Sequence, residues 1–373
     1  MDRPKRILQI GVGNFGRGGQ STIVLNFGLN QDSSKVVFDY LIIDKVSNEK
    51  YIKQIENKGG KVYELKLKSS IEKIYNLKKF FKNSNYETIH IHISVAKIST
   101  FIIQLLFKLY GGKTIILHSH STGIDTNKEN RKIALLRHNI FKKILPLMTD
   151  EFLACSKMAG EWLYPKKYQN RVKIINNGID IEKYKFNLEK RNYLRRKMNL
   201  ENKFILGHVG RFSHSKNHKF LIKIFNEVQK IEKESVLLLI GNGELEQEIK
   251  EKVKKINLED KVIFLGVTDK VEDYLQIMDV FVFPSRFEGL GLVAIEAQAS
   301  ALEVIASDKV PLEARVSNYL EYFSLNQTPK EWAEKILEYK NGYERKVISK
   351  ILEDKGYSIK NSTKELEKIY LNK

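Results

Sequence analysis

Short apolar runs alternate with longer amphipathic segments along the whole chain, and this series begins twice. One series opens with the run 6–11 and the other with the run 204–209, and a glycine closes each run. Alternating strands and helices form a parallel sheet wrapped by helices. A chain of 373 residues also exceeds the length at which a single core stops growing. The pattern predicts an α/β fold of two Rossmann-like, doubly wound lobes, residues 1–180 and 181–356.

Ligands of open parallel sheets bind beyond the carboxyl ends of the strands. In a two-lobed chain, these edges can face each other across an interdomain cleft. Polar residues that directly follow a predicted strand are therefore the candidates for a functional site. The polar, charged stretch 176–202 is predicted to be the connector between the lobes.

The net charge of +19 is concentrated in the first half, since residues 1–180 carry +15 and residues 181–373 carry +4. This asymmetry predicts an anionic partner for the first lobe, which is a membrane surface, a phospholipid or a nucleic acid. The single cysteine, Cys155, excludes a disulfide framework and a multi-cysteine zinc site. The longest apolar stretch, 101–109, is about half a membrane span. We therefore expect a cytosolic or peripheral protein without a signal peptide.

Two glutamates eight positions apart follow the predicted strand 280–283. Glu288 begins a Gly-Leu-Gly turn, Gly289, Leu290 and Gly291, and Glu296 lies on the helix that follows. Free amides at a helix N-terminus suit a phosphate, whereas the carboxylates suit sugar or ribose hydroxyls. Together they describe a nucleotide sugar. The alternative is that Glu288 is a solvated loop charge and Glu296 a first-turn residue favoured by the helix dipole.

Cations and histidines follow other predicted strands. Arg211 and Lys216 come after the strand 204–209, where they can neutralise a leaving diphosphate. His118 and His120 follow the strand 113–117 and can donate to a sugar hydroxyl or stabilise developing charge. Their spacing also fits a metal, but no third ligand cluster accompanies them, so no metal site is predicted. His90 and His92 alternate within a strand, and a structural role is favoured for them.

The N-terminal glycines support a rival hypothesis. Gly11, Gly13 and Gly16 match the dinucleotide fingerprint of an NAD-dependent oxidoreductase, with Asp44 as the ribose ligand. Asp44 lies later than the usual spacing, however, and the glycines continue at Gly18 and Gly19. The longer loop 16–19 suits close approach of the backbone to a ligand. A nucleic-acid-binding protein is a weaker rival, because the chain has no recognisable groove-reading helix.

These residues resemble the motifs of family-4 glycosyltransferases of the GT-B type, close to those that build bacterial capsular and exopolysaccharides. The resemblance spans nearly the whole chain and is most specific over residues 266–311. The matching positions are the Glu288 to Glu296 spacing, the N-G-[IV]-D stretch 175–180, the Arg211 and Lys216 pair, the glycine loop 16–19 and His118. The chain departs from the family at 301–303, where Ala-Leu-Glu replaces Gly-x-Pro.

The resemblance implies a retaining hexosyltransferase that needs no cofactor and no metal ion. Arg211 and Lys216 would hold the donor diphosphate, Glu288 the hydroxyls of the donor sugar and Glu296 the ribose. Amides of 289–291 would cap the phosphates, and His118 or His120 would orient the sugar. The expected donor is a UDP-linked hexose, and the expected acceptor is a polyprenyl-diphosphate-linked sugar.

Further expectations concern the surroundings of this enzyme. The basic first lobe, with the predicted helix 130–144 and the Lys-rich run 66–82, would rest on the anionic inner face of the plasma membrane. The glycine loop, Gly16, Gly18 and Gly19, would serve the acceptor or a phosphate. The last helix, within 357–373, would pack back on the first lobe. Nucleic acid is not an expected partner.

Overall fold

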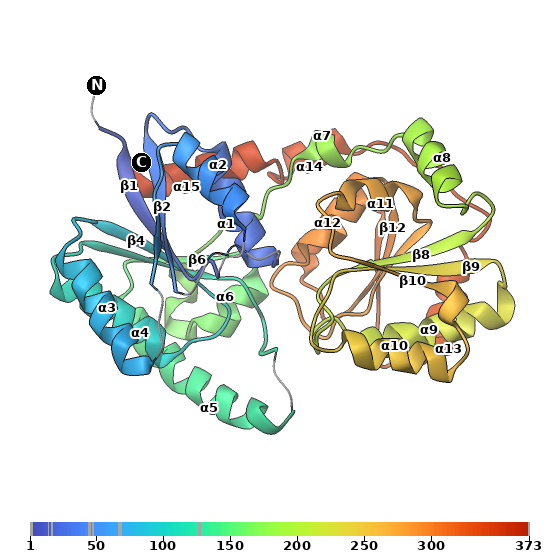
Figure 1. Cartoon of the computed structure of the whole chain (residues 1–373), viewed down its shortest axis with the longest axis horizontal. Coiled ribbons are helices and arrows are strands. Elements are labelled where there is room, and N and C mark those ends of the chain that lie inside the picture. The colour runs from blue at the N-terminus through green and yellow to red at the C-terminus, as the bar shows by residue number, and fades with distance from the viewer. Residues whose placement is uncertain are drawn as a thin grey trace. The chain divides into compact units, whose positions relative to one another are not determined.

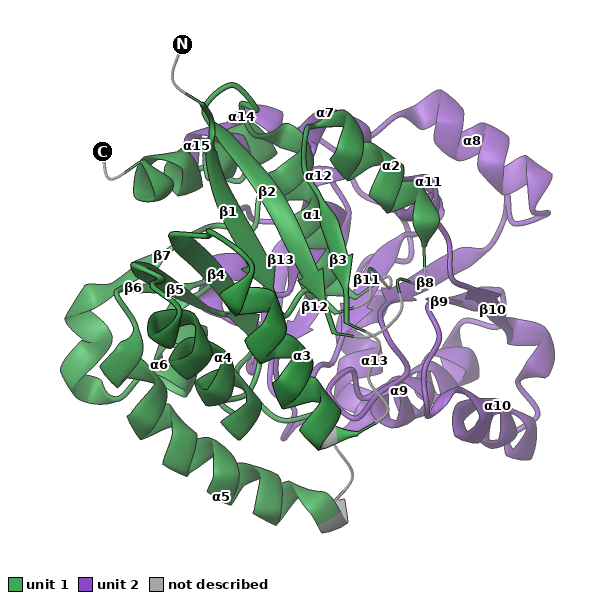
Figure 2. Cartoon of the chain, turned by 60° about the vertical axis from the view of Figure 1, so that its left-hand side comes forward, with its two compact units in different colours: residues 1–178, 356–373 green, residues 179–355 purple. Residues whose placement is uncertain are grey.

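A computed structural model describes residues 3–13, 15, 18–43, 46, 48–65, 69–125 and 128–371. The chain forms two compact units (Figure 2). Unit 1 contains residues 1–178 and 356–373, and unit 2 contains residues 179–355. The boundary between them falls two residues before the one predicted from the sequence.

Unit 1 is built on a seven-stranded sheet with the order β3-β2-β1-β4-β5-β6-β7, and every neighbouring pair is parallel. Its strands are β1 (Lys5–Ile10), β2 (Val36–Ile42), β3 (Val62–Glu64), β4 (Thr88–Ile93), β5 (Thr114–Ser119), β6 (Glu151–Ala154) and β7 (Val172–Ile174). Its helices are α1 (Gly19–Asn30), α2 (Glu49–Asn57), α3 (Ser70–Lys82), α4 (Ile98–Leu109), α5 (Lys128–Ile144), α6 (Lys157–Leu163) and α15 (Ile359–Tyr370). Figure 1 shows α3, α4 and α5 on one side of this sheet and α1, α2 and α15 on the other.

Unit 2 repeats the arrangement with a six-stranded parallel sheet of the order β10-β9-β8-β11-β12-β13. Its strands are β8 (Phe204–Val209), β9 (Ser235–Ile240), β10 (Val262–Gly266), β11 (Val280–Phe283), β12 (Glu303–Ser307) and β13 (Leu320–Phe323). Its helices are α7 (Ile181–Tyr184), α8 (Leu188–Lys197), α9 (His218–Ile231), α10 (Glu246–Lys255), α11 (Val271–Ile277), α12 (Leu292–Ala299), α13 (Pro329–Leu337) and α14 (Ser349–Asp354).

The predicted doubly wound α/β fold is confirmed in both units. Strands such as β2, β9 and β11 are buried along their whole length, because helices cover both faces of each sheet. In each unit the strand order reverses next to the first strand, between β1 and β4 and between β8 and β11. The connections on either side of this switch point run in opposite directions, which leaves room for a ligand at the carboxyl ends of the two strands.

The C-terminal helix α15 belongs to unit 1 and contacts α1. Its last residue, Tyr370, is buried and packs edge-on against Phe38 of β2, with the ring centroids 5.5 Å apart. The Lys5 ammonium donates to the Tyr370 backbone carbonyl at 2.8 Å. At the other end of α15, a Cβ on Gly178 would lie 2.6 Å from Ile359 Cα, so only glycine fits there.

The stretch predicted as a polar connector contains a helix that the sequence pattern did not reveal. α8 is strongly charged and has little amphipathic character, which is why hydrophobic periodicity misses it. Asn187 caps it by accepting a hydrogen bond from Lys190 N at 2.8 Å. Its attachment to the sheet is ionic, through two arginines of its inner face.

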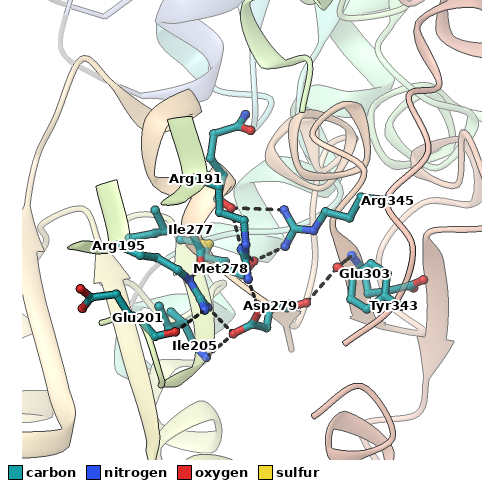
Figure 3. A network of polar contacts seen from close by, with 11 residues as sticks. Arg191, Arg195, Glu201, Ile205, Ile277, Met278, Asp279, Glu303, Tyr343 and Arg345 are labelled. Carbon is teal, nitrogen blue, oxygen red and sulfur yellow. Dashed lines mark hydrogen bonds and ion pairs between the residues drawn. The ribbon is translucent and has the colours of Figure 1, made fainter. Parts of the chain in front are cut away.

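Asp279, just before β11, is the anchor for this helix (Figure 3). Its two carboxylate oxygens accept hydrogen bonds from Arg191 and Arg195 of α8, and one of them also accepts from Ile205 N at 2.7 Å. Arg345 approaches from the C-terminal side and donates to the carbonyls of Met278 and Gln276. The network thus joins three distant segments of unit 2 at the start of its central strand.

We expect Asp279→Ala to lower the free energy of unfolding of unit 2 by about 3 kcal/mol or more, because it strands two largely buried guanidinium groups. Chemical denaturation followed by circular dichroism measures the change. Glu87→Ala is the control, since it breaks an exposed ion pair with Lys113 and should cost less than about 1 kcal/mol. Equal costs for the two variants would contradict the anchoring role.

Candidate active site

Two loops meet at the switch point of unit 2. The loop 210–217 follows β8 and the loop 284–291 follows β11. The Arg286 amide donates to the Ser215 carbonyl at 2.7 Å, and Asn217 Nδ2 donates to the Pro284 carbonyl at 3.1 Å. The Arg286 guanidinium donates in turn to Asn217 Oδ1 at 2.9 Å. These bonds hold the loops together where a ligand of this sheet is expected.

Lys216 and Glu288 form an ion pair across these loops. Lys216 Nζ lies 2.7 Å from Glu288 Oε1 and 4.7 Å from the centroid of the Phe283 ring. The two side chains are only 17% and 12% exposed, so Glu288 is not a solvated loop charge. The sequence singled out both residues but did not predict their pairing, because they are 72 positions apart and only the strand order brings them together.

Arg211 has a different setting from Lys216. Its side chain is 69% exposed and pairs with Glu244, in the loop after β9, at 3.0 Å. An exposed ion pair of this kind contributes little to stability and is readily exchanged for another partner. Arg211 therefore lies on a loop at the carboxyl edge of the sheet with a guanidinium that can turn toward an anion.

Glu296 lies beyond the first turn of α12, which begins at Leu292 and has no acidic residue in that turn. The helix dipole at the N-terminus therefore does not account for it. Its Oε1 accepts a hydrogen bond from the Tyr184 hydroxyl at 2.8 Å. Tyr184, from the short helix α7, is a partner that no sequence motif indicated.

The turn between the two glutamates has the features of a helix N-terminus that can receive an anion. Gly291 is the N-cap residue of α12, with a φ of 87°, and no side chain caps the helix. A Cβ there would be strained, because L-residues rarely adopt this conformation. Leu290 is buried and fixes the turn to the core of unit 2, and Gly289 links it to Glu288.

Four histidines gather on one face of the unit 1 sheet. His90 and His92 of β4 lie beside His118 of β5 and His120, the residue after β5, because residues two apart share a face and the strands are adjacent. His118 Nδ1 lies 3.2 Å from His90 Nε2, and His120 Nε2 lies 2.9 Å from His92 Nδ1. His118 is fully buried, whereas His120 is partly exposed at the carboxyl end of the strand.

Burial lowers the pKa of all four imidazoles, and that of His120 falls to about 3. The group is therefore neutral at physiological pH. Ring nitrogens of His90, His92 and His118 lie within 4.8 Å of one another, close enough for a metal ion. Hydrogen bonds already engage every ring nitrogen of these three residues except His118 Nε2. A bound ion would have to displace them, so the arrangement fits a hydrogen-bonded cluster better than a metal centre.

Comparison with known proteins shows similarity to glycosyltransferases. Residues 190–351 match the family model "Glycosyl transferases group 1". The chain is 29% identical to the putative glycosyltransferase EpsF of Bacillus subtilis, over 98% of this chain and 96% of that one. It is also 29% identical to the capsular polysaccharide biosynthesis glycosyltransferase CapH of Staphylococcus aureus, over 79% of each chain. These matches support a family-4-like GT-B glycosyltransferase.

Other glycosyltransferases share the sequence or the fold. The Escherichia coli UDP-Gal:alpha-D-GlcNAc-diphosphoundecaprenol alpha-1,3-galactosyltransferase is 26% identical over 65% of this chain and 63% of its own length. The crystal structure of Anabaena HepE in complex with UDP-glucose superposes with a TM-score of 0.73 at 15% identity, covering 98% of this chain and 95% of that one. Sucrose-phosphate synthase of Thermosynechococcus elongatus gives a TM-score of 0.76 at 18% identity, covering 99% and 98%.

The N-terminal glycine loop of this glycosyltransferase does not favour the dinucleotide hypothesis. A Cβ on Gly11 would lie 2.1 Å from the His92 carbonyl oxygen, so close packing against β4 already requires a glycine at this position. The helix α1 begins only at Gly19, which leaves a loop longer than a pyrophosphate turn. Gly16 and Asp44 lie outside the described residues. A Cβ on Gly18 or Gly19 would meet no described atom within 4 Å, so their neighbours in the described part of the chain do not require glycine.

Glu296 gives the glycosyltransferase a pH-dependent stability. Burial raises the pKa of its carboxyl from 4.5 to about 7. The folded protein therefore binds more protons than the unfolded chain between these values, and the stability contributed by this group is lost as pH rises through about 7.

We expect Glu296→Gln to remove that loss, so that the variant gains up to about 3 kcal/mol relative to wild type between pH 4.5 and pH 8. Denaturant unfolding of both proteins across this range measures the difference. Glu303, whose pKa burial also raises to about 7, contributes equally to both proteins and cancels. A difference in stability between the two proteins that does not change with pH would contradict the raised pKa of Glu296.

Proposed function

We propose that this glycosyltransferase moves a hexose from a UDP-linked donor to a polyprenyl-diphosphate-linked acceptor in the synthesis of a capsular or exported polysaccharide, with retention of anomeric configuration. The observation that carries the proposal is the contact between Lys216 and Glu288 at the switch point of unit 2. A cation for a diphosphate and an acid for sugar hydroxyls are held side by side where a nucleotide sugar would bind.

The donor-binding roles follow from the chemistry of each group. Lys216 and Arg211 would neutralise the diphosphate, with amides of the turn 289–291 completing the phosphate site. Glu288, already held by Lys216, would accept hydrogen bonds from hydroxyls of the hexose. Glu296 would accept from the ribose once its carboxyl is ionised, and Tyr184 would keep it oriented.

The reaction needs no carboxylate nucleophile in this scheme. The acceptor hydroxyl oxygen bonds to the anomeric carbon on the face from which the bond to the phosphate oxygen breaks, and its proton passes to the departing phosphate. Lys216 and Arg211 stabilise the charge that develops on the diphosphate, which is the part that a metal ion would otherwise play. We propose that His120, the exposed member of the histidine cluster, hydrogen-bonds a sugar hydroxyl, with the buried His118 behind it.

Support for the donor and acceptor classes comes from the relatives. The name of the Escherichia coli relative specifies a UDP-sugar donor and a diphosphoundecaprenol-linked acceptor. EpsF and CapH are glycosyltransferases that match most of this chain, and the name of CapH places it in capsular polysaccharide biosynthesis.

We expect Lys216→Met to weaken UDP binding by about tenfold or more. We expect Glu288→Gln to leave UDP binding near wild type and to lower the rate of sugar transfer at least about 100-fold. Calorimetry measures binding, and product formation from a UDP-hexose measures transfer. Glu248→Gln is the matched control, because Glu248 forms an exposed ion pair with Lys219 in the same unit.

Wild-type binding and transfer in both site variants would overturn the assignment of the donor site. A thermal-shift comparison of UDP with ADP and NAD would test the class of nucleotide independently, because a ligand stabilises only the folded state that binds it. Stabilisation by NAD and not by UDP would favour the oxidoreductase instead.

The membrane contact is part of the proposal, and unit 1 supports it. Ile133, Leu136 and Ile140 recur on one face of α5 and are 54%, 63% and 48% exposed. Exposed Lys132 and Arg137 lie on the same helix. Apolar residues flanked by cations suit an anionic lipid surface. Helices α3 and α4, on the same side of the sheet, add exposed apolar side chains, Ile71, Ile74, Tyr75, Ile98, Leu105 and Leu109. None of the helices formed by the described residues is long and apolar enough to span a membrane.

We expect the double variant Ile133→Ser and Leu136→Ser to reduce the fraction of protein that sediments with phosphatidylglycerol vesicles at low salt by about tenfold, since it removes apolar area that the bilayer would bury. The control is Leu188→Ser with Ile231→Ser, two similarly exposed residues of unit 2. Equal sedimentation of both variants and wild type, or no preference for anionic over phosphatidylcholine vesicles, would contradict the membrane contact.

A further inference from the structure

Two chains of hydrogen bonds run through the histidine cluster, one from the side chain of Gln9 on β1 and one from the hydroxyl of Tyr370 on α15. In the first, Gln9 Oε1 lies 2.8 Å from His92 Nε2, and His92 Nδ1 lies 2.9 Å from His120 Nε2. In the second, the Tyr370 hydroxyl of α15 lies 2.6 Å from His90 Nδ1, and His90 Nε2 lies 3.2 Å from His118 Nδ1. The first chain ends at His120 and the second at His118.

The first chain fixes the tautomer of His120. A neutral imidazole has one nitrogen that donates and one that accepts. Gln9 Oε1 can only accept, so His92 carries its proton on Nε2 and accepts at Nδ1. His120 must then donate from Nε2. Its Nδ1 is left as an unprotonated acceptor, and no described residue hydrogen-bonds it.

The second chain fixes the tautomer of His118. His90 Nδ1 is the hydrogen-bond partner of the Tyr370 hydroxyl in the described part of the chain, at 2.6 Å. The hydroxyl proton is therefore directed to His90 Nδ1, because it would otherwise be buried without an acceptor. His90 donates from Nε2 to His118 Nδ1, and His118 keeps its proton on Nε2, a buried atom without a partner in the described part of the chain.

We propose that Gln9 and Tyr370 are positioning residues that hold all four histidines as Nε2–H tautomers, so that His120 presents an unprotonated Nδ1 at the carboxyl end of β5. The catalytic consequence rests on the proposed function: His120 accepts a hydrogen bond from a sugar hydroxyl and cannot act as the donor. His120 has no proton on Nδ1 to give to the leaving group, so the proton that the departing phosphate gains comes from the acceptor hydroxyl. Turning the Gln9 amide over would reverse the first chain, so the orientation of one side chain sets the tautomer of His120.

Nitrogen-15 NMR of the full chain with labelled histidine tests the cluster directly, because long-range coupling patterns distinguish the two tautomers. At pH 7.5 we expect Nε2–H patterns for His90, His92, His118 and His120, with each signal assigned by its loss in a single His→Asn variant. Nδ1–H patterns at His118 and His120 would overturn the proposal, whatever reaction the enzyme catalyses.

Variants separate the two chains. Tyr370→Phe removes the donor to His90, so His118 should become a mixture of tautomers while His120 keeps its Nε2–H pattern. Gln9→Leu should make His120 a mixture of tautomers and lower kcat about tenfold or more, with the KM for the nucleotide sugar little changed. Tyr40→Phe is the control, since its buried hydroxyl makes only a weak bond to the Val24 carbonyl at 3.5 Å.

Unchanged tautomers in Gln9→Leu would overturn the positioning role, as would an unchanged kcat despite mixed tautomers. Nε2–H tautomers in an enzyme that transfers nothing from nucleotide sugars would instead refute the proposed function alone. Gln9→Glu adds a sharper test, because a carboxylate also accepts from His92 Nε2. It should keep the His120 tautomer, so activity near wild type in Gln9→Glu beside reduced activity in Gln9→Leu would assign the contact with substrate to His120.

Discussion

The reversal of strand order beside the first strand of each sheet is the constraint on which the rest of this structure depends. Parallel strands place all their carboxyl ends on one edge, and the reversal opens a gap in the helices at one point of that edge. In unit 2 this point lies between β8 and β11, and in unit 1 between β1 and β4. Lys216, Glu288 and the histidine cluster are distant in sequence, yet each lies at or next to such a point.

Much of this organisation could be predicted from the residues. The strands are recognisable because buried parallel strands are continuous apolar runs, and the position of Glu288 after β11 indicates the edge where a ligand is expected. The helix α8 escaped prediction for the opposite reason, since its stability comes from Arg191 and Arg195 on Asp279 and not from an apolar face. Hydrophobic periodicity reveals a helix that buries an apolar face, but it does not reveal a helix that ion pairs attach to the sheet.

The partners within the candidate site were not predictable in the same way. The contact of Lys216 with Glu288 and that of Tyr184 with Glu296 each require two segments to meet, and one sequence without the fold does not show which segments those are. The histidines illustrate the limit. Alternation within β4 indicated that His90 and His92 share a face, but their pairing with β5 and with Gln9 depends on strand order. Residue types thus revealed the chemistry available, and topology determined which groups act together.

The return of α15 to unit 1 has a consequence for how the protein is made. This helix is translated after the whole of unit 2, so the ribosome must finish the second unit before the first can be completed. Until then the nascent first unit lacks the side chain of Tyr370, and the cleared space beside Phe38 and His90 is open to water. A chain that terminates before α15 would carry a complete unit 2 and an incomplete unit 1, so completion of the histidine cluster reports that translation has run past residue 370.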